Sequence, residues 1–315
     1  MILTARWIVP VSHPPIENGF VEVRHGRIVA VGRRAQLPAT NDIDPRRADF
    51  GEAAITPGFV NPHTHLELGC YAGHLPPSSL WDWIGGLIEL RRRPGAGARE
   101  RAALEEYAWR TLRAGVTCVG DISRRGDAWA VLKNVPIRKV CFAELLTLAD
   151  EPPRSVSELR AAIESVEEDD LLTAGVSPHA PYTVPAEQFA DAIRLADELD
   201  RPWTTHLAET PEEAAFLRGD ASRIPAMLAQ RMRSCGVASP ASSPGAFVER
   251  VATGRSPGCL AHLNYADSAD FEAVARDGHA VVYCPRAHRF YGHARYPLED
   301  ALAAGVRLAI GTDSP

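Results

Sequence analysis

From Gly58 onward the sequence alternates between short apolar runs and amphipathic stretches, and this alternation restricts the fold more than any other feature. Between the apolar runs, apolar side chains recur at spacings of three and four, which is typical of one face of a helix. Strands that alternate with helices form parallel sheets. We therefore predict an α/β fold whose architecture is a (β/α)₈ TIM barrel, with a doubly wound sheet as the alternative. The expected strands begin near Phe59, Val116, Arg138, Gly175, Pro202, Cys259, Ala280 and Val306.

Local signals mark several helix boundaries and one interruption. Ser155-Val156-Ser157-Glu158 is typical of a capping box, and Pro185 is a good first residue for the helix that follows it. Residues 211–258 interrupt the alternation, and here we expect two helical pieces and a Ser/Pro-rich loop over 238–245. Loops of this length in a compact domain are usually functional lids or disordered connectors.

The first 56 residues differ from the rest and are predicted to form a small β unit. Residues 20–24 and 27–31 are apolar runs joined at His25-Gly26, which indicates a hairpin. A polar stretch, 38–49, then leads to Ala54 and Ile55. We predict a small β-sandwich unit over residues 1–56, here incomplete, and a hydrolase barrel over residues 57–315.

Composition excludes several function classes. The chain has 315 residues and a net charge of −6, which argues against binding to nucleic acid or to an anionic membrane. It contains no apolar run of about 18 residues and no signal-peptide pattern at its start. The 6 cysteines include no C-x-x-C pair, which argues against a zinc ribbon or a redox dithiol. We expect a cytoplasmic protein with a small-molecule substrate.

The pair His63 and His65 is the first chemical signal. Side chains two apart on a strand point to the same face, so both imidazoles project into one site, as a divalent metal requires. A single His-x-His pair is weak evidence, but His206, His262 and Asp313 fall at the ends of three later expected strands. Imidazoles and a carboxylate that converge in this way predict a catalytic metal site with a position left for water.

Four motifs in chain order, PGFVNPHTHLE, HLAET, HLNY and GTDS, resemble those of the amidohydrolase superfamily. The most similar branch contains the S-adenosylhomocysteine/methylthioadenosine deaminases, the aminodeoxyfutalosine deaminases and the triazine chlorohydrolases. The resemblance covers practically the whole chain. It implies that one metal ion is held by His63, His65, His206 and Asp313. It also implies that His262 contacts the metal-bound water and that Glu209 is a proton shuttle.

Two-metal members of the superfamily use a bridging carboxylated lysine on the fourth strand. That strand, 175–179, contains no lysine, and the two lysines of the chain, Lys133 and Lys139, lie near the third strand. We therefore predict one divalent ion, zinc, with ferrous iron as the alternative because this ligand set suits both.

Four further residues are predicted to contact the substrate. The segment 177–184, SPHAPYTV, resembles that of adenosine-type deaminases, where the histidine, here His179, contacts the purine; a merely hydrogen-bonded strand end is the alternative. Asp82 is a candidate for binding ribose hydroxyls, or else an ordinary helix-start aspartate. Residues 283–288, YCPRAH, match a seventh-strand motif, and Arg286 and His288 are candidates for substrate binding. Ala287-His288 departs from the Ser-Asn or Thr-Asn of many relatives and favours aminodeoxyfutalosine-like ones.

The predicted function is the deamination of an adenine-type nucleoside by metal-activated water. Glu209 passes a proton to the ring nitrogen, while His262 and Asp313 orient and deprotonate the attacking water. One alternative is a triazine chloro- or aminohydrolase, or a guanine or cytosine deaminase, which uses the same water in a different pocket. Another is a truncated, inactive barrel that only binds a ligand. Two-metal hydrolysis of a cyclic amide is disfavoured by the missing lysine.

The sequence ends at Pro315, directly after the last predicted ligand, whereas relatives continue with an eighth helix and further strands. We expect a version extended through that helix to have a higher thermal midpoint, because apolar strand faces need a covering layer. A homo-oligomer is another way to cover the same edge.

Overall fold

The computed structural model describes residues 1–37, 46–124, 126–148, 154–239 and 241–314. The chain divides into two compact units, Met1–Phe59 and Val60–Pro315, which are described separately below. The proposed boundary between residues 56 and 57 stays a prediction.

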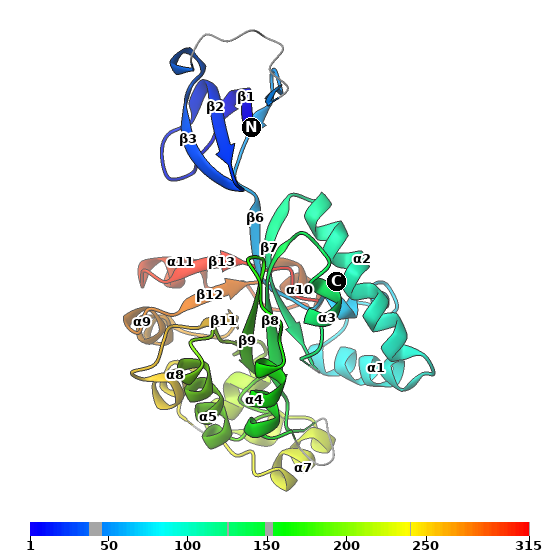
Figure 1. Cartoon of the computed structure of the whole chain (residues 1–315). Coiled ribbons are helices and arrows are strands. Elements are labelled where there is room, and N and C mark those ends of the chain that lie inside the picture. Colours follow the sequence, from blue (N-terminus) through cyan, green and yellow to red (C-terminus); the bar gives the residue numbers. More distant parts are fainter. Residues whose placement is uncertain (38–45, 125, 149–153, 240, 315) are drawn as a thin grey trace. The chain divides into compact units, whose positions relative to one another are not determined.

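The smaller unit is built on a 5-stranded sheet in the order β3-β2-β1-β4, with β5 also paired to β1 (Figure 1). The predicted hairpin is confirmed, because β2 and β3 pair antiparallel around His25 and Gly26, whose φ angles are 49° and 72°. The last residues of the polar stretch 38–49 form β4, which pairs in parallel with β1; residues 38–45 lie outside the described part. The strands are β1 (Ile2–Ile8), β2 (Ile16–Arg24), β3 (Arg27–Arg33), β4 (Arg47–Asp49) and β5 (Ala54–Ile55).

The larger unit contains two 4-stranded parallel sheets whose strands follow one another in chain order. This sequential order differs from that of a doubly wound sheet, in which the order reverses at a switch point. Isolated parallel bridges also pair Val176 with Trp203 and Thr64 with Asp313. The first sheet holds β6 (Phe59–Thr64), β7 (Val116–Ser123), β8 (Arg138–Leu145) and β9 (Leu172–Pro178). The second holds β10 (Thr204–Leu207), β11 (Cys259–His262), β12 (Ala280–Tyr283) and β13 (Arg307–Ile310).

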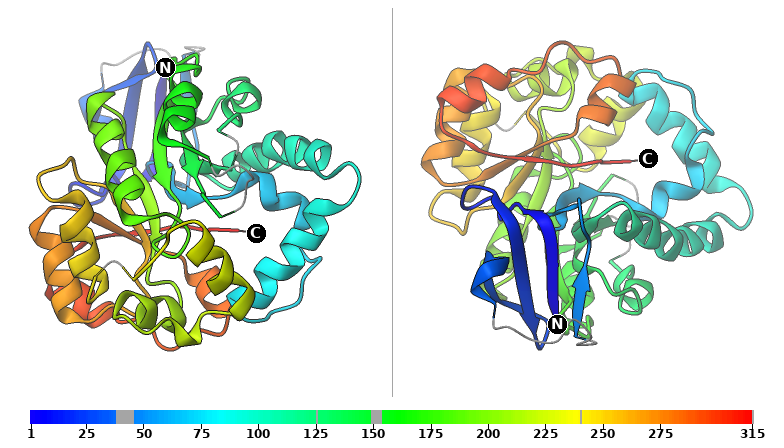
Figure 2. Two further views of the ribbon diagram at one scale, coloured as in Figure 1. Left: turned by 90° about the horizontal axis from the view of Figure 1, so that it is seen from below. Right: turned by 90° about the horizontal axis from the view of Figure 1, so that it is seen from above.

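Helices lie outside the strands of this unit (Figure 2), so the predicted mixed α/β fold is confirmed. The capping box before α4 is present, with the Ser155 side chain accepting from the Glu158 N–H. Helix α5 begins at Ala186, one residue later than predicted, so Pro185 is its N-cap. These helices are α1 (Leu80–Arg92), α2 (Ala96–Arg113), α3 (Trp129–Leu132), α4 (Val156–Glu164), α5 (Ala186–Glu198), α9 (Ser268–Arg276), α10 (Pro285–Phe290) and α11 (Leu298–Ala303). No helix in the described part of the chain is long and apolar enough to cross a membrane.

The 211–258 segment holds three α-helices instead of the two expected: α6 (Pro211–Leu217), α7 (Ala226–Ser234) and α8 (Pro244–Ala252). The expected Ser/Pro-rich loop is shorter than predicted, because Ser243 caps α8 and Pro244 is its first residue. Helix α8 belongs to the core, since Phe247 is 1% exposed and packs against Phe189 of α5 with ring centroids 4.9 Å apart. The expectation of a lid or connector is therefore wrong for α8.

Candidate active site

The first and last strands of the larger unit meet at the candidate site. The backbone N–H groups of Thr312 and Asp313 donate to the carbonyl of His63 at 3.2 and 3.0 Å. This register places the Asp313 carboxylate 3.5 Å from His63 Nε2, although the two residues are far apart in sequence. Both side chains are buried, and both residues lie at strand ends that the pattern of apolar residues predicts.

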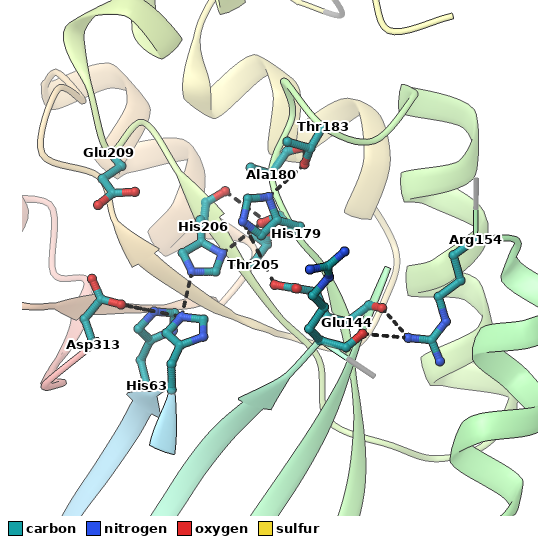
Figure 3. Close-up of polar contacts among 12 residues, drawn as sticks. His63, Glu144, Arg154, His179, Ala180, Thr183, Thr205, His206, Glu209 and Asp313 are labelled. Carbon is teal, nitrogen blue, oxygen red and sulfur yellow. Dashed lines mark hydrogen bonds and ion pairs between the residues drawn. The ribbon is translucent and has the colours of Figure 1, made fainter. Parts of the chain in front are cut away.

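All five residues predicted at the metal centre come together, and Figure 3 shows three of them, His63, His206 and Asp313. One potential ligand atom of each of His63, His206, His262 and Asp313 lies within 4.8 Å of the others. His65 joins this group because its Nε2 is 3.2 Å from Nε2 of His206 and 3.5 Å from Oδ1 of Asp313. Four separate strands therefore supply the cluster.

The hydrogen-bond partners of the histidine ring nitrogens indicate whether this cluster suits a metal ion. His206 Nδ1 lies 3.1 Å from the carbonyl of His179 and donates to it, which leaves the lone pair of Nε2 facing His65. Both ring nitrogens of His63 and Nε2 of His262 are buried without a hydrogen-bond partner among the described residues. Buried polar atoms normally have partners. Converging, unpartnered nitrogen lone pairs beside a carboxylate fit a divalent cation.

The protonation state of two of the imidazoles also favours the binding of a metal ion. Burial lowers the pKa of His65 and of His262 to about 3 each, against a smaller upward effect of the Asp313 charge. These two imidazoles are therefore neutral at physiological pH, which is the form that binds metals.

The site also holds backbone strain. His262 and Asp313 have φ angles of 75° and 57°, and Ala208, beside Glu209, has a φ of 49°. These left-handed conformations are unfavourable for residues other than glycine and persist only where surrounding contacts enforce them.

Glu209 lies next to the imidazole cluster, with Oε2 3.7 Å from His262 Nε2. Its side chain is buried, and burial raises its pKa well above the usual range, with the charges of Asp313 and Glu213 acting in the same direction. A carboxyl group with a raised pKa can serve as a general acid and base.

His179 packs against the cluster and faces a carboxylate that the sequence analysis missed. Its ring centroid is 4.7 Å from that of His206. Its Nδ1 donates to the Thr183 hydroxyl at 2.8 Å, since that hydroxyl itself donates to the Ala180 carbonyl, and so Nε2 is left as an acceptor 4.0 Å from Glu144 Oε1 (Figure 3). Burial raises the pKa of Glu144 to about 7.

Two buried carboxylates next to the site had a signal in the sequence that could have revealed them. Glu144 and Asp121 each stand alone as charged residues inside an apolar strand run. Asp121 is fully buried, and its Oδ1 accepts from the N–H of Leu66, directly after His65. A charged residue within a buried strand indicates a local partner or function.

The three other residues predicted to contact the substrate, Asp82, Arg286 and His288, differ in exposure and in hydrogen bonding. Asp82 is exposed at the start of α1, where its N–H donates to the Ser79 hydroxyl and its carboxylate accepts from that hydroxyl. Arg286 is exposed on α10. His288 is buried, with Nδ1 3.1 Å from Asn264 Oδ1 and Nε2 2.5 Å from the Ala294 carbonyl. Its ring nitrogens thus bind the protein, and the substrate roles of all three residues stay predictions.

Comparison with known proteins identifies the family, because a profile of the Amidohydrolase family matches residues 54–315. The chain belongs to the amidohydrolase family. The predicted resemblance and the predicted enzyme class, a hydrolase acting on C–N bonds, are confirmed. Membership of this family and the imidazole cluster together support a metal cofactor.

Individual relatives cover nearly the whole chain. It is 26% identical to a 5-methylthioadenosine/S-adenosylhomocysteine deaminase of Desulforudis audaxviator, over 99% of this chain and 69% of the relative. It is 28% identical to the enzyme of the same name from Moorella thermoacetica, over 97% of this chain and 68% of the relative. The chain therefore spans about two thirds of the length of these relatives.

Two solved structures of deaminases are also similar to this chain. An adenosine deaminase from Xanthomonas campestris with bound zinc is 26% identical, with a TM-score of 0.74 over 99% of this chain and 68% of that one. The Helicobacter pylori aminofutalosine deaminase in complex with methylthio-coformycin has a TM-score of 0.79 at 21% identity, over 99% of this chain and 76% of that one, which shows the shared fold.

Proposed function

We propose that this protein is a metal-dependent aminohydrolase that removes the exocyclic amine of an adenine-type nucleoside and releases ammonia. The observation that carries the proposal is the convergence of four unpartnered or mutually facing imidazoles and Asp313 beside a buried Glu209 whose pKa is raised. The relatives named as methylthioadenosine/S-adenosylhomocysteine and adenosine deaminases support the substrate class. S-adenosylhomocysteine, methylthioadenosine, adenosine and aminodeoxyfutalosine are the members of that class to test.

In this proposal one zinc ion is held by His63, His65, His206 and Asp313. Such an ion, when bound, supplies Lewis acidity that makes water a stronger acid. A single ion is supported by the position of Lys139, whose Nζ donates to the carbonyls of Leu132 and Val135 and is thus engaged away from the cluster.

The residues around the ion divide the proton transfers between them. His262 Nε2 and the Asp313 carboxylate orient the attacking water and accept its hydrogen. Glu209 delivers its proton to the ring nitrogen beside the attacked carbon, then takes up the proton that the water lost to His262 or Asp313 and passes it to the amine as the C–N bond breaks. His179 presents Nε2 to the purine, and Asp82 and Arg286 are further candidate contacts for the rest of the nucleoside.

The proposal also includes the finer architecture. We infer a (β/α)₈ barrel over residues 57–315, since parallel bridges pair the strand ends of the two sheets at Val176–Trp203 and Thr64–Asp313. Active sites of such barrels lie at the carboxyl ends of the strands, where the cluster is found. The small unit over residues 1–56 is proposed as part of a β-sandwich.

An ammonia-release screen tests the proposal. Zinc-loaded protein is incubated separately with adenosine, S-adenosylhomocysteine, methylthioadenosine, aminodeoxyfutalosine, guanine and melamine. We expect ammonia from at least one adenine nucleoside and little from guanine or melamine. Turnover of melamine or guanine alone would favour the triazine or guanine reaction, and no turnover of any compound would favour an inactive binding barrel.

A further inference from the structure

We propose that Glu213 and Asn264 hold the main chain of Glu209 from both ends and thereby position its carboxyl group. We call these two residues the Glu209 clamp. The inference rests on the proposed role of Glu209 as proton carrier. Both members are assigned as positioning residues because their polar atoms contact the Glu209 peptide and not the imidazole cluster.

Glu213 holds the amino side of this peptide. Its side chain is fully buried, and its two carboxylate oxygens accept from the N–H groups of Ala208 and Glu209, each at 2.9 Å. Glu213 is the third residue of α6, and its own N–H donates to the Thr210 hydroxyl at 3.1 Å. In an ordinary capping box the carboxylate at this position reaches the N–H of the cap residue itself. Here it reaches back to the two residues before the cap, which include the proposed catalytic one.

The backbone conformation of Ala208 needs hydrogen bonds that maintain it. Ala208 has a φ of 49°, a left-handed conformation that is unfavourable for alanine. Its N–H is bound by Glu213, and its carbonyl accepts from the N–H of Tyr265 at 3.2 Å. Both polar groups of Ala208 are thus occupied, which keeps the chain turned so that Glu209 faces His262.

Asn264 holds the carbonyl side. It is buried, and its side-chain amide donates to the Glu209 carbonyl at 3.0 Å. A carbonyl oxygen only accepts, so the NH₂ group of Asn264 faces Glu209, and Asn264 Oδ1 lies at the other end, 3.1 Å from His288 Nδ1. His288, a predicted substrate contact, therefore supports the clamp through Asn264.

The substitution Glu213→Gln tests the clamp because it changes the hydrogen-bonding groups of this side chain and keeps its shape. A carboxylate offers two acceptor oxygens to two N–H donors, whereas the amide of Gln offers one acceptor and turns an NH₂ group toward the other donor. The side chain keeps its shape, so the change acts on one hydrogen bond of the clamp.

The chain offers a matched control, Asp270→Asn. Asp270 is also a buried carboxylate at the third position of a helix, and it accepts from the N–H groups of Gly245 at 2.8 Å and Asp267 at 3.0 Å. It holds α8 to α9 and contacts no residue of the proposed active site.

The zinc-loaded protein is compared in four forms: wild type, Glu213→Gln, Glu209→Gln and the double variant. Amide hydrogen exchange at residues 208 and 209, zinc content and kcat for ammonia release are measured. We expect Glu213→Gln to speed this exchange about tenfold and to lower kcat tenfold to a hundredfold, with zinc content unchanged. In the Glu209→Gln background it should lower kcat no further, because its effect passes through Glu209.

Asp270→Asn should lower the thermal midpoint without changing the exchange at 208 and 209 or kcat. Unchanged exchange in Glu213→Gln, or an equal loss of kcat in both backgrounds, overturns the clamp. If Glu213→Gln does not fold, Asn264→Asp, which lacks the amide donor, is measured against the same criteria. If wild-type protein releases no ammonia from any candidate, the proposed function fails, and the exchange result alone decides the clamp.

Discussion

Burial acts in opposite directions on the two kinds of ionisable side chain in the candidate site. It lowers the pKa of His65 and His262 to about 3, and it raises the pKa of Glu209 well above the usual range. At neutral pH these two imidazoles are therefore uncharged and present lone pairs, while the raised pKa of Glu209 suits a group that gives up and takes back a proton. The same physical cause prepares one set of groups to bind a cation and another group to move a proton.

Glu209→Gln should retain zinc and the fold but lose about 10²- to 10⁴-fold in kcat, because Gln keeps the shape and cannot carry a proton. Steady-state ammonia release and elemental analysis measure the two effects. His206→Ala is the contrasting variant and should lose zinc together with activity. A Glu209→Gln protein within about tenfold of wild-type kcat would remove Glu209 from the mechanism.

His179→Ala should weaken activity on an adenine nucleoside and leave the zinc content intact. The contact from His206 goes to the backbone carbonyl of His179, which the substitution preserves. We expect KM to rise by about tenfold, as for the loss of one polar substrate contact. Loss of zinc from this variant would contradict the assignment, since it would make His179 a ligand.

At the scale of elements, close approach of the strands positions the histidine pair. Gly120 of β7 lies so near β6 that an added Cβ would be 2.4 Å from the carbonyl oxygen of Pro62, next to His63. A backbone atom cannot move aside easily, so only glycine fits here. The spacing between the first two strands of this sheet therefore depends on a single residue without a side chain.

Gly120→Ala should destabilise the protein by about 1–3 kcal/mol through overpacking. Gly85→Ala is the control: it lies in α1, where nothing is within 4 Å of an added Cβ, and should stabilise the protein by up to about 1 kcal/mol. Urea unfolding of both variants measures the difference. Equal free energies of unfolding for Gly120→Ala and the wild type would show that β6 and β7 can separate without cost.

The elements that could be predicted from the sequence are those whose sequence signals are local. Strand ends that carry His63, His206, His262 and Asp313 follow from apolar runs and motif spacing, and the capping box at Ser155 follows from four consecutive residues. Glu144 and Asn264 were not assigned roles, because their partners lie on other strands and loops. The start of α8 was missed since Ser243 and Pro244 are typical of loops as well as of helix starts. Pairing across the fold decides these cases.

At the scale of the whole molecule, the candidate metal site joins residues 63, 206, 262 and 313, which are distant in the chain. An ion that binds the folded form and not the unfolded form stabilises the fold by about 4 kcal/mol when its concentration is a thousand times Kd. Removing zinc with a chelator should therefore lower the thermal midpoint by roughly 10 °C, and adding zinc should restore it. Identical midpoints for the two forms, measured by calorimetry, would contradict a site built from these strands.

The most direct test of the central claim is a zinc titration of the metal-free protein, with ammonia release from an adenine nucleoside as the signal. We expect activity to rise linearly to one zinc per chain and then to stay constant. An increase that continues to two zinc ions per chain, or no ammonia from any of the four nucleosides at full occupancy, would contradict it.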